Sequence, residues 1–231
     1  MLDGLSFTVG EGETLALVGP SGCGKTTALK IVNRLVDHDS GEVLAFGRDV
    51  RGEDPIALRR RLGYVIQEAG LFPHWTVRQN VEAVPRLLGW RRDAARNRSD
   101  ELLALVNLPA AEFGERRPRE LSGGQRQRVG VARALAAYPP VLLMDEPFGA
   151  LDPIARRSMQ REFGEWKRRL GKAVLLVTHD LREAFRLGDR VAILERGRVH
   201  QIGTPPEILA SPADDFVREF VFDELPESVR A

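Results

Sequence analysis

The chain has 231 residues, 43% of them hydrophobic, so it can bury a sizeable core without a disulfide or a metal ion to support it. Its single cysteine excludes a disulfide framework within the chain and a cysteine-rich zinc site, and is typical of a reducing compartment. The 34 Lys and Arg residues nearly balance the 33 Asp and Glu residues, so the net charge does not indicate a nucleic-acid or anionic-membrane surface.

The first predicted elements are mostly strands. Residues 5–9 alternate apolar and polar side chains, as a half-exposed strand does, and a glycine-containing turn leads into the apolar run 14–18, which is typical of a buried strand. Further short strands are expected at residues 40–47 and 62–67, with a short basic helix that starts at Asp54-Pro55 between them. Together they predict a partly antiparallel N-terminal β portion.

Residues 19–27 fit the pattern G-x-x-x-x-G-K-[ST] of a phosphate-binding loop. The loop follows a predicted strand and precedes a predicted helix that starts near Ala28, which is the context this motif requires. Glycines let backbone N–H groups point inward around phosphates, and the helix N-terminus adds partial positive charge. We predict that Lys25 reaches the β- and γ-phosphates of a nucleotide and that the Thr26 hydroxyl binds Mg²⁺. The expected nucleotide-contacting residues are Gly19, Pro20, Ser21, Gly22, Cys23, Gly24, Lys25, Thr26 and Thr27.

Residues 76–118 change to helical spacing, with leucines recurring among many charged side chains. The pair Arg91-Arg92 is interpreted as part of a solvated helical face. We therefore expect one domain over residues 1–231, with a nucleotide-binding core formed by 1–75 and 119–231 and a helical subdomain formed by 76–118.

Strands return in the second half of the chain. The continuous apolar runs 141–144 and 173–177 are typical of a parallel sheet covered on both faces, and Asp152-Pro153 is predicted to begin the helix between them. Residues 191–194 and 198–202 are predicted to form a hairpin. The expected fold class is α/β, a P-loop NTPase core with a mainly parallel sheet, an N-terminal antiparallel portion and an inserted helical subdomain.

None of these apolar runs is long enough to cross a bilayer, and no secretory signal pattern is seen at the N-terminus, so a cytoplasmic location is expected.

Two acids close the predicted strand that ends at Met144. In P-loop enzymes such a strand end supplies a second contact to Mg²⁺, and Asp145 fits that role. The neighbouring Glu146 could polarise an attacking water as a general base. Two strand-end acids that merely face solvent are the alternative, which the presence of the phosphate-binding loop disfavours.

A second candidate phosphate site precedes the predicted helix that starts near residue 123. A serine and two glycines at a helix start can bind an anion, although an ordinary serine N-cap with a flexible glycine pair has the same residues. Two phosphate sites in one chain mean that the chain binds two nucleotides or that it lends one site to a neighbouring molecule. On physical grounds both arrangements remain possible for this chain. The residues concerned are Leu121, Ser122, Gly123, Gly124 and Gln125.

These motifs, in this order, resemble the ATP-binding subunits of ABC transporters, and the resemblance covers nearly the whole chain. Leu121–Gln125 matches the signature of that family. The resemblance implies a head-to-tail homodimer, in which Ser122, Gly123 and Gly124 contact the γ-phosphate of the ATP that is bound to Lys25 of the partner.

The same resemblance assigns further roles. Gln67 stands where the family has its Q-loop glutamine, which contacts Mg²⁺ and senses the transmembrane partner. Asp152 ends a segment that resembles the D-loop, which joins the two active sites, and His179 resembles the switch histidine that contacts the γ-phosphate and the attacking water. Plain structural interpretations, a helix N-cap for Asp152 and a polar strand end for His179, are compatible with these roles.

The implied cofactors are ATP and Mg²⁺. The implied catalytic residues are Glu146, His179 and Gln67, and the implied metal ligands are Thr26, Gln67 and Asp145. The implied partners are a second ATPase subunit, transmembrane permease subunits and a substrate-binding protein or domain, without nucleic acid. Such a chain would lie at the cytoplasmic face of the membrane, held there by the permease.

Three segments, residues 28–35, 63–67 and 70–74, are similar to the importers of quaternary amines such as glycine betaine, choline and carnitine, which implies a role in osmoprotectant import. His74 then belongs to the groove that receives a permease coupling helix. The alternatives are an importer of another small solute, an ABC-type ATPase of DNA repair or translation, and a nucleotide kinase. The interval between Gln67 and Leu121 is too short for the long coiled coil of the repair type, and a kinase leaves the signature unexplained.

Most members of this family begin with a further strand whose aromatic residue stacks on adenine, and the present chain starts after that strand. We therefore expect the functional protein to start upstream of Met1, and the chain as given to discriminate poorly between ATP and GTP.

Overall fold

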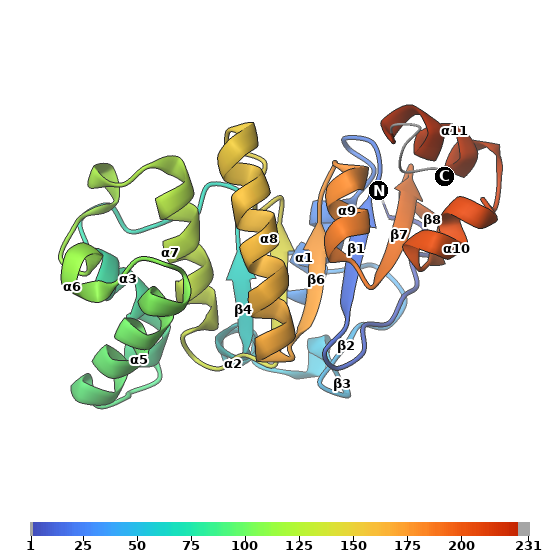
Figure 1. The fold of residues 1–231 in the computed structure, drawn as a ribbon. Helices are drawn as coiled ribbons and strands as arrows, with labels where there is room; N and C mark the ends of the chain where they lie inside the picture. Colours follow the sequence, from blue (N-terminus) through green and yellow to red (C-terminus); the bar gives the residue numbers. More distant parts are fainter. Residues whose placement is uncertain (1, 226–231) are drawn as a thin grey trace. The chain divides into compact units, whose positions relative to one another are not determined.

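The computed structural model describes residues 2–225, apart from the side chain of residue 168, and the chain forms two compact units. Unit 1 is built from the two ends of the chain, Met1–Pro55 and Leu170–Ala231, and unit 2 from the middle, Ile56–Arg169 (Figure 1). The predicted α/β class is confirmed, because a mainly parallel sheet and a separate antiparallel ribbon are both present.

The sheet of unit 1 has the strand order β6-β1-β7-β8. The strand β1 (Thr14–Val18) lies between β6 (Ala173–Val177) and β7 (Arg190–Glu195) and runs parallel to both, with Leu15 opposite Leu175 and Arg190. Every residue of β1 and β6 is buried, as the continuous apolar runs predicted.

The predicted hairpin is confirmed by β7 and the antiparallel strand β8 (Arg198–Gly203). Arg196 (φ 47°) and Gly197 (φ 84°) form its two-residue turn, and both take the left-handed conformation that such turns need.

Helices pack against the strands of the unit 1 sheet. The helix α1 (Lys25–Val32) contacts β6, and α9 (Leu181–Leu187) contacts β1 and β7 and lies in front of the sheet in Figure 1. The C-terminal helices α10 (Pro205–Ala210) and α11 (Asp215–Glu224) follow β8, and a short 3₁₀ turn, η1 (Val50–Gly52), follows β3. Side-chain oxygens of Asp180, Thr204 and Asp214 accept hydrogen bonds from the first-turn N–H groups of α9, α10 and α11.

Two strand predictions for the N-terminal part need correction. Residues 5–9 alternate in exposure as expected but form no strand, because within residues 2–225 no neighbouring strand pairs with their backbone. The strand expected at 40–47 is reduced to β2 (Leu44–Ala45), which pairs with β3 (Arg48–Asp49). The cause is the turn at Phe46 (φ 58°) and Gly47 (φ 75°), which reverses the chain directly after Ala45.

Unit 2 contains the parallel strands β4 (Leu62–Val65) and β5 (Val141–Asp145), with Val65 opposite Met144. The helix α7 contacts β4, α3 and α5. The helices of this unit are α2 (Pro55–Arg61), α3 (Val77–Val81), α4 (Ala83–Leu87), α5 (Arg92–Leu105), α6 (Ala110–Phe113), η2 (Pro118–Glu120), α7 (Gly123–Leu135) and α8 (Pro153–Leu170).

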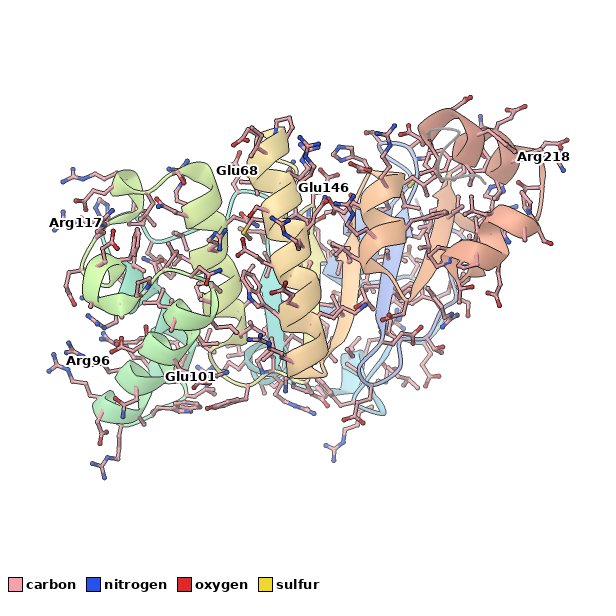
Figure 2. All side chains as sticks on the ribbon, in the orientation of Figure 1. Glu68, Arg96, Glu101, Arg117, Glu146 and Arg218 are labelled. Atoms are coloured by element: carbon pink, nitrogen blue, oxygen red, sulfur yellow. The ribbon has the colours of Figure 1, made fainter. Side chains whose placement is uncertain are left out.

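The helical spacing at residues 76–118 corresponds to α3–α6. Arg91 and Arg92 are exposed, as expected of a solvated face, and Arg96 of α5 points away from the ribbon in Figure 2. Among the described residues no helix has both the length and the hydrophobicity needed to span a bilayer.

Candidate functional site

The candidate residues fall into two groups, one on each unit. On unit 1 the loop at 19–24 connects β1 to α1, as predicted. Gly19 (φ 154°), Gly22 (φ 81°) and Gly24 (φ 107°) all have backbone conformations that side chains with a Cβ rarely adopt, and Gly24 is the residue that precedes the first turn of α1. Gly19 is also sterically constrained, because a Cβ there would lie 2.0 Å from the carbonyl oxygen of Leu194.

Lys25 lies across this loop. Its side chain is only 5% exposed, and its ammonium donates hydrogen bonds to the carbonyl oxygens of Gly19 (2.7 Å) and Pro20 (3.0 Å). The Sγ atom of the buried Cys23 lies 3.6 Å from the same nitrogen. The positive charge is therefore held over the loop by neutral acceptors, which a phosphate group can replace with a stronger, charge-assisted bond.

Gly19→Ala is expected to destabilise unit 1 by about 3 kcal/mol and to abolish nucleotide binding, since the new Cβ overlaps the backbone of β7. Gly22→Ala is the matched control, because a Cβ at Gly22 meets nothing within 4 Å and only the left-handed conformation costs about 1 kcal/mol. Thermal unfolding and titration with a fluorescent ATP analogue measure both effects. Equal melting temperatures for the two variants would contradict the steric argument.

His179 follows β6 and is exposed. The residues on either side fix it: Thr178 is buried, and its Oγ1 accepts a hydrogen bond from the backbone N–H of Asp180 (3.1 Å). The Asp180 carboxylate in turn caps α9 through the N–H groups of Arg182 and Glu183. His179 is thus exposed on a hydrogen-bonded turn between β6 and α9. This position is compatible with a switch histidine and with a plain polar strand end.

On unit 2 the ends of β4 and β5 bring two predicted catalytic residues together. Gln67 follows β4, Glu146 follows β5 (labelled in Figure 2), and the Gln67 amide donates a hydrogen bond from Nε2 to Oε2 of Glu146 over 3.2 Å. Glu146 has a φ of 44°, an uncommon value for a residue with a side chain, which redirects the chain directly after the strand. Such conformations are often found at functional sites.

Tyr64 is a residue of this group that our sequence interpretation missed. Burial above all, and then the charge and the hydrogen bond of the Asp145 carboxylate, raise the pKa of Tyr64 to about 12. The phenol of Tyr64 is thus a hydrogen-bond donor to the Asp145 carboxylate. The strand register is the signal that was available: Tyr64 pairs with Leu143, so its side chain is on the same face of the sheet as Asp145, two residues further on.

The predicted metal ligands offer only oxygen donors: the Asp145 carboxylate and the amide oxygen of Gln67 on unit 2, and the Thr26 hydroxyl on unit 1. Within the described residues no group of three or more His, Cys, Asp and Glu side chains could hold a metal ion. Mg²⁺ needs no such cage, since it is usually held by one or two carboxylates together with phosphates of the substrate and water. The donors of each unit are therefore of the kind that Mg²⁺ takes when it is bound together with a nucleotide.

The predicted signature lies at the start of α7. Ser122 and Gln125 form a capping box, in which the Ser122 Oγ accepts from Gln125 N–H (3.2 Å) and the Gln125 Oε1 accepts from Ser122 N–H (2.9 Å). Leu121 is buried, whereas Ser122 and Gly123 are exposed. The interpretation as an ordinary N-cap is therefore correct, but it does not explain the two glycines.

Neither glycine of the signature is required by the fold of this chain. Gly123 and Gly124 do not have a positive φ, and a Cβ on either would have no neighbour closer than 3.8 Å. A glycine in a helix lowers the free energy of unfolding by about 1 kcal/mol relative to alanine. Packing does not explain why this helix begins with two of them. Close approach of a molecule outside this chain would explain them.

Asp152 is the N-cap of α8, as predicted. Its Oδ1 accepts hydrogen bonds from the N–H groups of Ile154 and Ala155, both over 3.0 Å, and the bonds from Ala155 and then Ile154 lower the pKa of Asp152. A role in a contact with a second subunit remains a prediction.

The chain matches the protein family described as "ABC transporter" over residues 2–149. It is 51% identical over 223 residues to the glycine betaine/carnitine/choline transport ATP-binding protein OpuCA of Bacillus subtilis, an alignment that covers 96% of this chain and 58% of OpuCA. It is 52% identical to the osmoprotectant import ATP-binding protein OsmV of Salmonella typhimurium (95% and 58% covered) and 52% identical to the glycine betaine uptake system ATP-binding protein YehX of Escherichia coli (94% and 70% covered). The chain thus spans little more than half the length of the first two relatives.

Among solved structures, the chain is similar to a dimeric structure of a post-hydrolysis state of the ATP-binding cassette MJ0796 bound to ADP and Pi. The TM-score is 0.77 at 34% sequence identity, with 88% of this chain and 90% of that chain covered.

Proposed function

Because the chain belongs to the ABC transporter family, we propose that it is the ATP-hydrolysing subunit of a membrane importer for quaternary-amine osmoprotectants. The observation that carries this proposal is an identity of about half of all residues to three relatives whose names specify osmoprotectant or glycine betaine import or transport. The chemistry of the site agrees with it, since the glycine conformations of residues 19–24 and the acid pair at the end of β5, Asp145 and Glu146, are those that phosphoryl transfer uses.

In the proposed reaction Lys25 exchanges its two carbonyl partners for the β- and γ-phosphates of ATP. Thr26, Asp145 and Gln67 would hold Mg²⁺, which neutralises charge on those phosphates when it is bound. Glu146 accepts the proton of the attacking water, and the hydrogen bond from the Gln67 amide to Oε2 restricts the orientation of that carboxylate. His179 would contact the γ-phosphate.

The proposed assembly is a head-to-tail homodimer, in which the signature of one subunit contacts the ATP of the other. Two observations support it. The pair Gly123-Gly124 has no steric reason among the residues that the structure describes, and the solved ABC cassettes that this chain resembles are described as dimeric.

A permease is the proposed membrane partner, and the loop at residues 71–75 is its proposed docking surface. Phe72 (47% exposed) and Trp75 (38% exposed) present two adjacent rings whose centroids are 4.5 Å apart. The fully buried Asn80 holds them in place, because its side chain accepts from the N–H of Phe72 (2.7 Å) and donates to the carbonyl oxygens of Phe72 (3.2 Å) and Thr76 (2.9 Å). Exposed aromatic rings on a rigid loop are typical of an interaction site.

In this assembly His74 of the same loop would contribute to the docking groove, as predicted, and the permease would hold the subunit at the cytoplasmic face of the membrane. A substrate-binding protein or domain would deliver the solute to the permease from the other side.

Phe72→Ala is expected to reduce the stimulation of ATP hydrolysis by the co-purified permease about tenfold, which is the usual effect of removing an aromatic anchor from an interface. The basal rate of the isolated subunit should change far less. Leu87→Ala is the matched control, because Leu87 is an exposed apolar side chain (63%) outside this loop. ATPase assays in detergent or nanodiscs, with and without permease, measure both. Stimulation by DNA instead of by a permease would favour the repair-type alternative and contradict the proposal.

A further inference from the structure

The segment that carries Gln67, residues 66–70, is bound along one side of α7. The Gln127 side chain donates to the carbonyl oxygen of Ile66 (3.4 Å), and the Arg133 guanidinium donates to the carbonyl oxygens of Ala69 (2.6 Å) and Gly70 (2.7 Å). Between them Gly130 lets the backbone approach, since a Cβ there would lie 3.3 Å from the Cβ of Ala69. The helix that begins at the signature therefore holds both ends of the segment that contains Gln67.

Arg133 differs in its partners from Arg78 and Arg128, two other inward-directed arginines of unit 2. Arg78 and Arg128 form ion pairs with Asp100 and Glu162, respectively. Arg133 has no carboxylate partner among the described residues, and burial lowers the pKa of its guanidinium. A half-buried cation whose acceptors are two neutral carbonyl groups gives up hydration without the compensation of an ion pair.

The segment 66–70 has an unfavourable backbone conformation that contacts from outside the segment must stabilise. Ala69 (φ 56°) and Gly70 (φ 51°) are successive residues in the left-handed conformation, which is unfavourable for alanine. The Arg133 fork binds the carbonyl oxygens of both and fixes this turn. Because the turn starts two residues after Gln67, its conformation determines where the Gln67 side chain points.

We propose that Arg133 is a positioning residue, which fixes the segment 66–70 and thereby holds the Gln67 amide on the Glu146 carboxylate. The signature and the proposed general base are then linked within one subunit through α7, Arg133 and Gln67. A displacement of α7 when its N-terminus meets the partner's nucleotide would reach Glu146 by this route. This inference rests on the proposed ATP hydrolysis.

The test is a double-mutant cycle on the full chain with Arg133→Met and Gln67→Ala, read as kcat and KM for ATP. We expect Arg133→Met to lower kcat about tenfold with little change in KM, and Gln67→Ala to lower kcat at least tenfold and also to raise KM, since it removes a proposed Mg²⁺ ligand as well. The double change should lower kcat no further than Gln67→Ala alone, because Arg133 acts through Gln67. A product of the two losses, about a hundredfold, would overturn the proposal, because Arg133 would then act independently of Gln67.

Two further variants separate positioning from stability. Arg128→Met removes another arginine of α7, whose partner is Glu162, and its loss of kcat should multiply with that of Gln67→Ala. Arg133→Lys keeps the charge but replaces the planar two-nitrogen fork with a single ammonium on a shorter side chain, so about a threefold loss is expected, and it replaces Arg133→Met in the cycle if that variant does not fold. Absence of ATP hydrolysis by the wild-type chain would reject the proposed function, whereas active wild-type protein with multiplying losses would reject this inference alone.

Discussion

Glu146→Gln is expected to reduce steady-state ATP hydrolysis by about 10²–10⁴-fold while ATP binding persists, because the amide keeps the shape of the side chain but cannot accept the proton of the attacking water. The structure shows why binding should survive. The atom that receives the hydrogen bond of Gln67 is the side-chain oxygen Oε2, and the amide oxygen of the variant can accept the same bond. The nucleotide should therefore be trapped before hydrolysis.

Phosphate release assays and size-exclusion chromatography in the presence of ATP measure the two parts of this prediction. The variant should elute as a dimer with ATP, whereas the wild-type protein returns to monomer as ATP is consumed. Glu68→Gln is the matched control, since Glu68 is an exposed acid of the segment that follows β4 and should keep the wild-type rate. Hydrolysis by Glu146→Gln at the wild-type rate would remove Glu146 from the role of general base.

Ser122→Arg is expected to abolish hydrolysis while the variant still binds ATP to its own Lys25 loop. A bulky cation at this exposed position obstructs the close approach that Gly123 and Gly124 leave open. The change also removes the N-cap of α7, which is worth about 1 kcal/mol, so Ser122→Ala serves as the control that loses the cap without adding bulk.

Mixing Ser122→Arg with Lys25→Ala tests whether the site is shared between subunits. Each site combines the Lys25 loop of one subunit with the signature of the other, so both sites are defective in either homodimer. In a mixed dimer the two defects meet in one site, and the other site has an intact loop and an intact signature. Activity should therefore return when the two inactive proteins are combined, as measured by phosphate release against mixing ratio. Wild-type hydrolysis by Ser122→Arg alone would contradict the shared-site arrangement.

The sequence predicts those elements well in which the local pattern of side chains matches the place of the element in the folded chain. The buried strands at residues 14–18, 141–144 and 173–177 are continuous apolar runs because they lie inside a covered parallel sheet, and the hairpin at β7 and β8 has a glycine in its turn. Asp152-Pro153 likewise starts a helix by local chemistry alone.

The predictions that were wrong depended on partners rather than on pattern. Residues 5–9 alternate as a strand does, but a strand needs a neighbour for its backbone groups, and alternation says nothing about the neighbour. In the segment 40–47 the reversal at Phe46 and Gly47 was decisive, and a phenylalanine in the left-handed conformation is not something that its type suggests.

The sequence predicts the motif residues of the site but not the residues that position them. Gln67 and Glu146 lie in recognisable motifs, and their contact follows from the parallel pairing of β4 and β5. Tyr64 and Arg133 were missed because their roles depend on geometry, a shared face of the sheet for one and two carbonyl groups of a turn for the other. A tyrosine in a strand or an arginine in a helix can have many roles, and residue type alone does not distinguish between them.

Unit 1 is assembled from both ends of the chain, and this has a consequence for the order of events during synthesis. Thr14 of β1 pairs with Val174, and Leu15 pairs with Arg190, so β1 has no neighbour until the ribosome has released those residues. Pairings this distant in sequence form slowly, because the entropy of loop closure must be overcome before any contact stabilises them. Unit 2, Ile56–Arg169, is continuous and can form its contacts earlier. The phosphate-binding loop is therefore completed last, and the nascent chain carries the largely apolar β1 unpaired through most of its translation, which makes it a candidate client for chaperones.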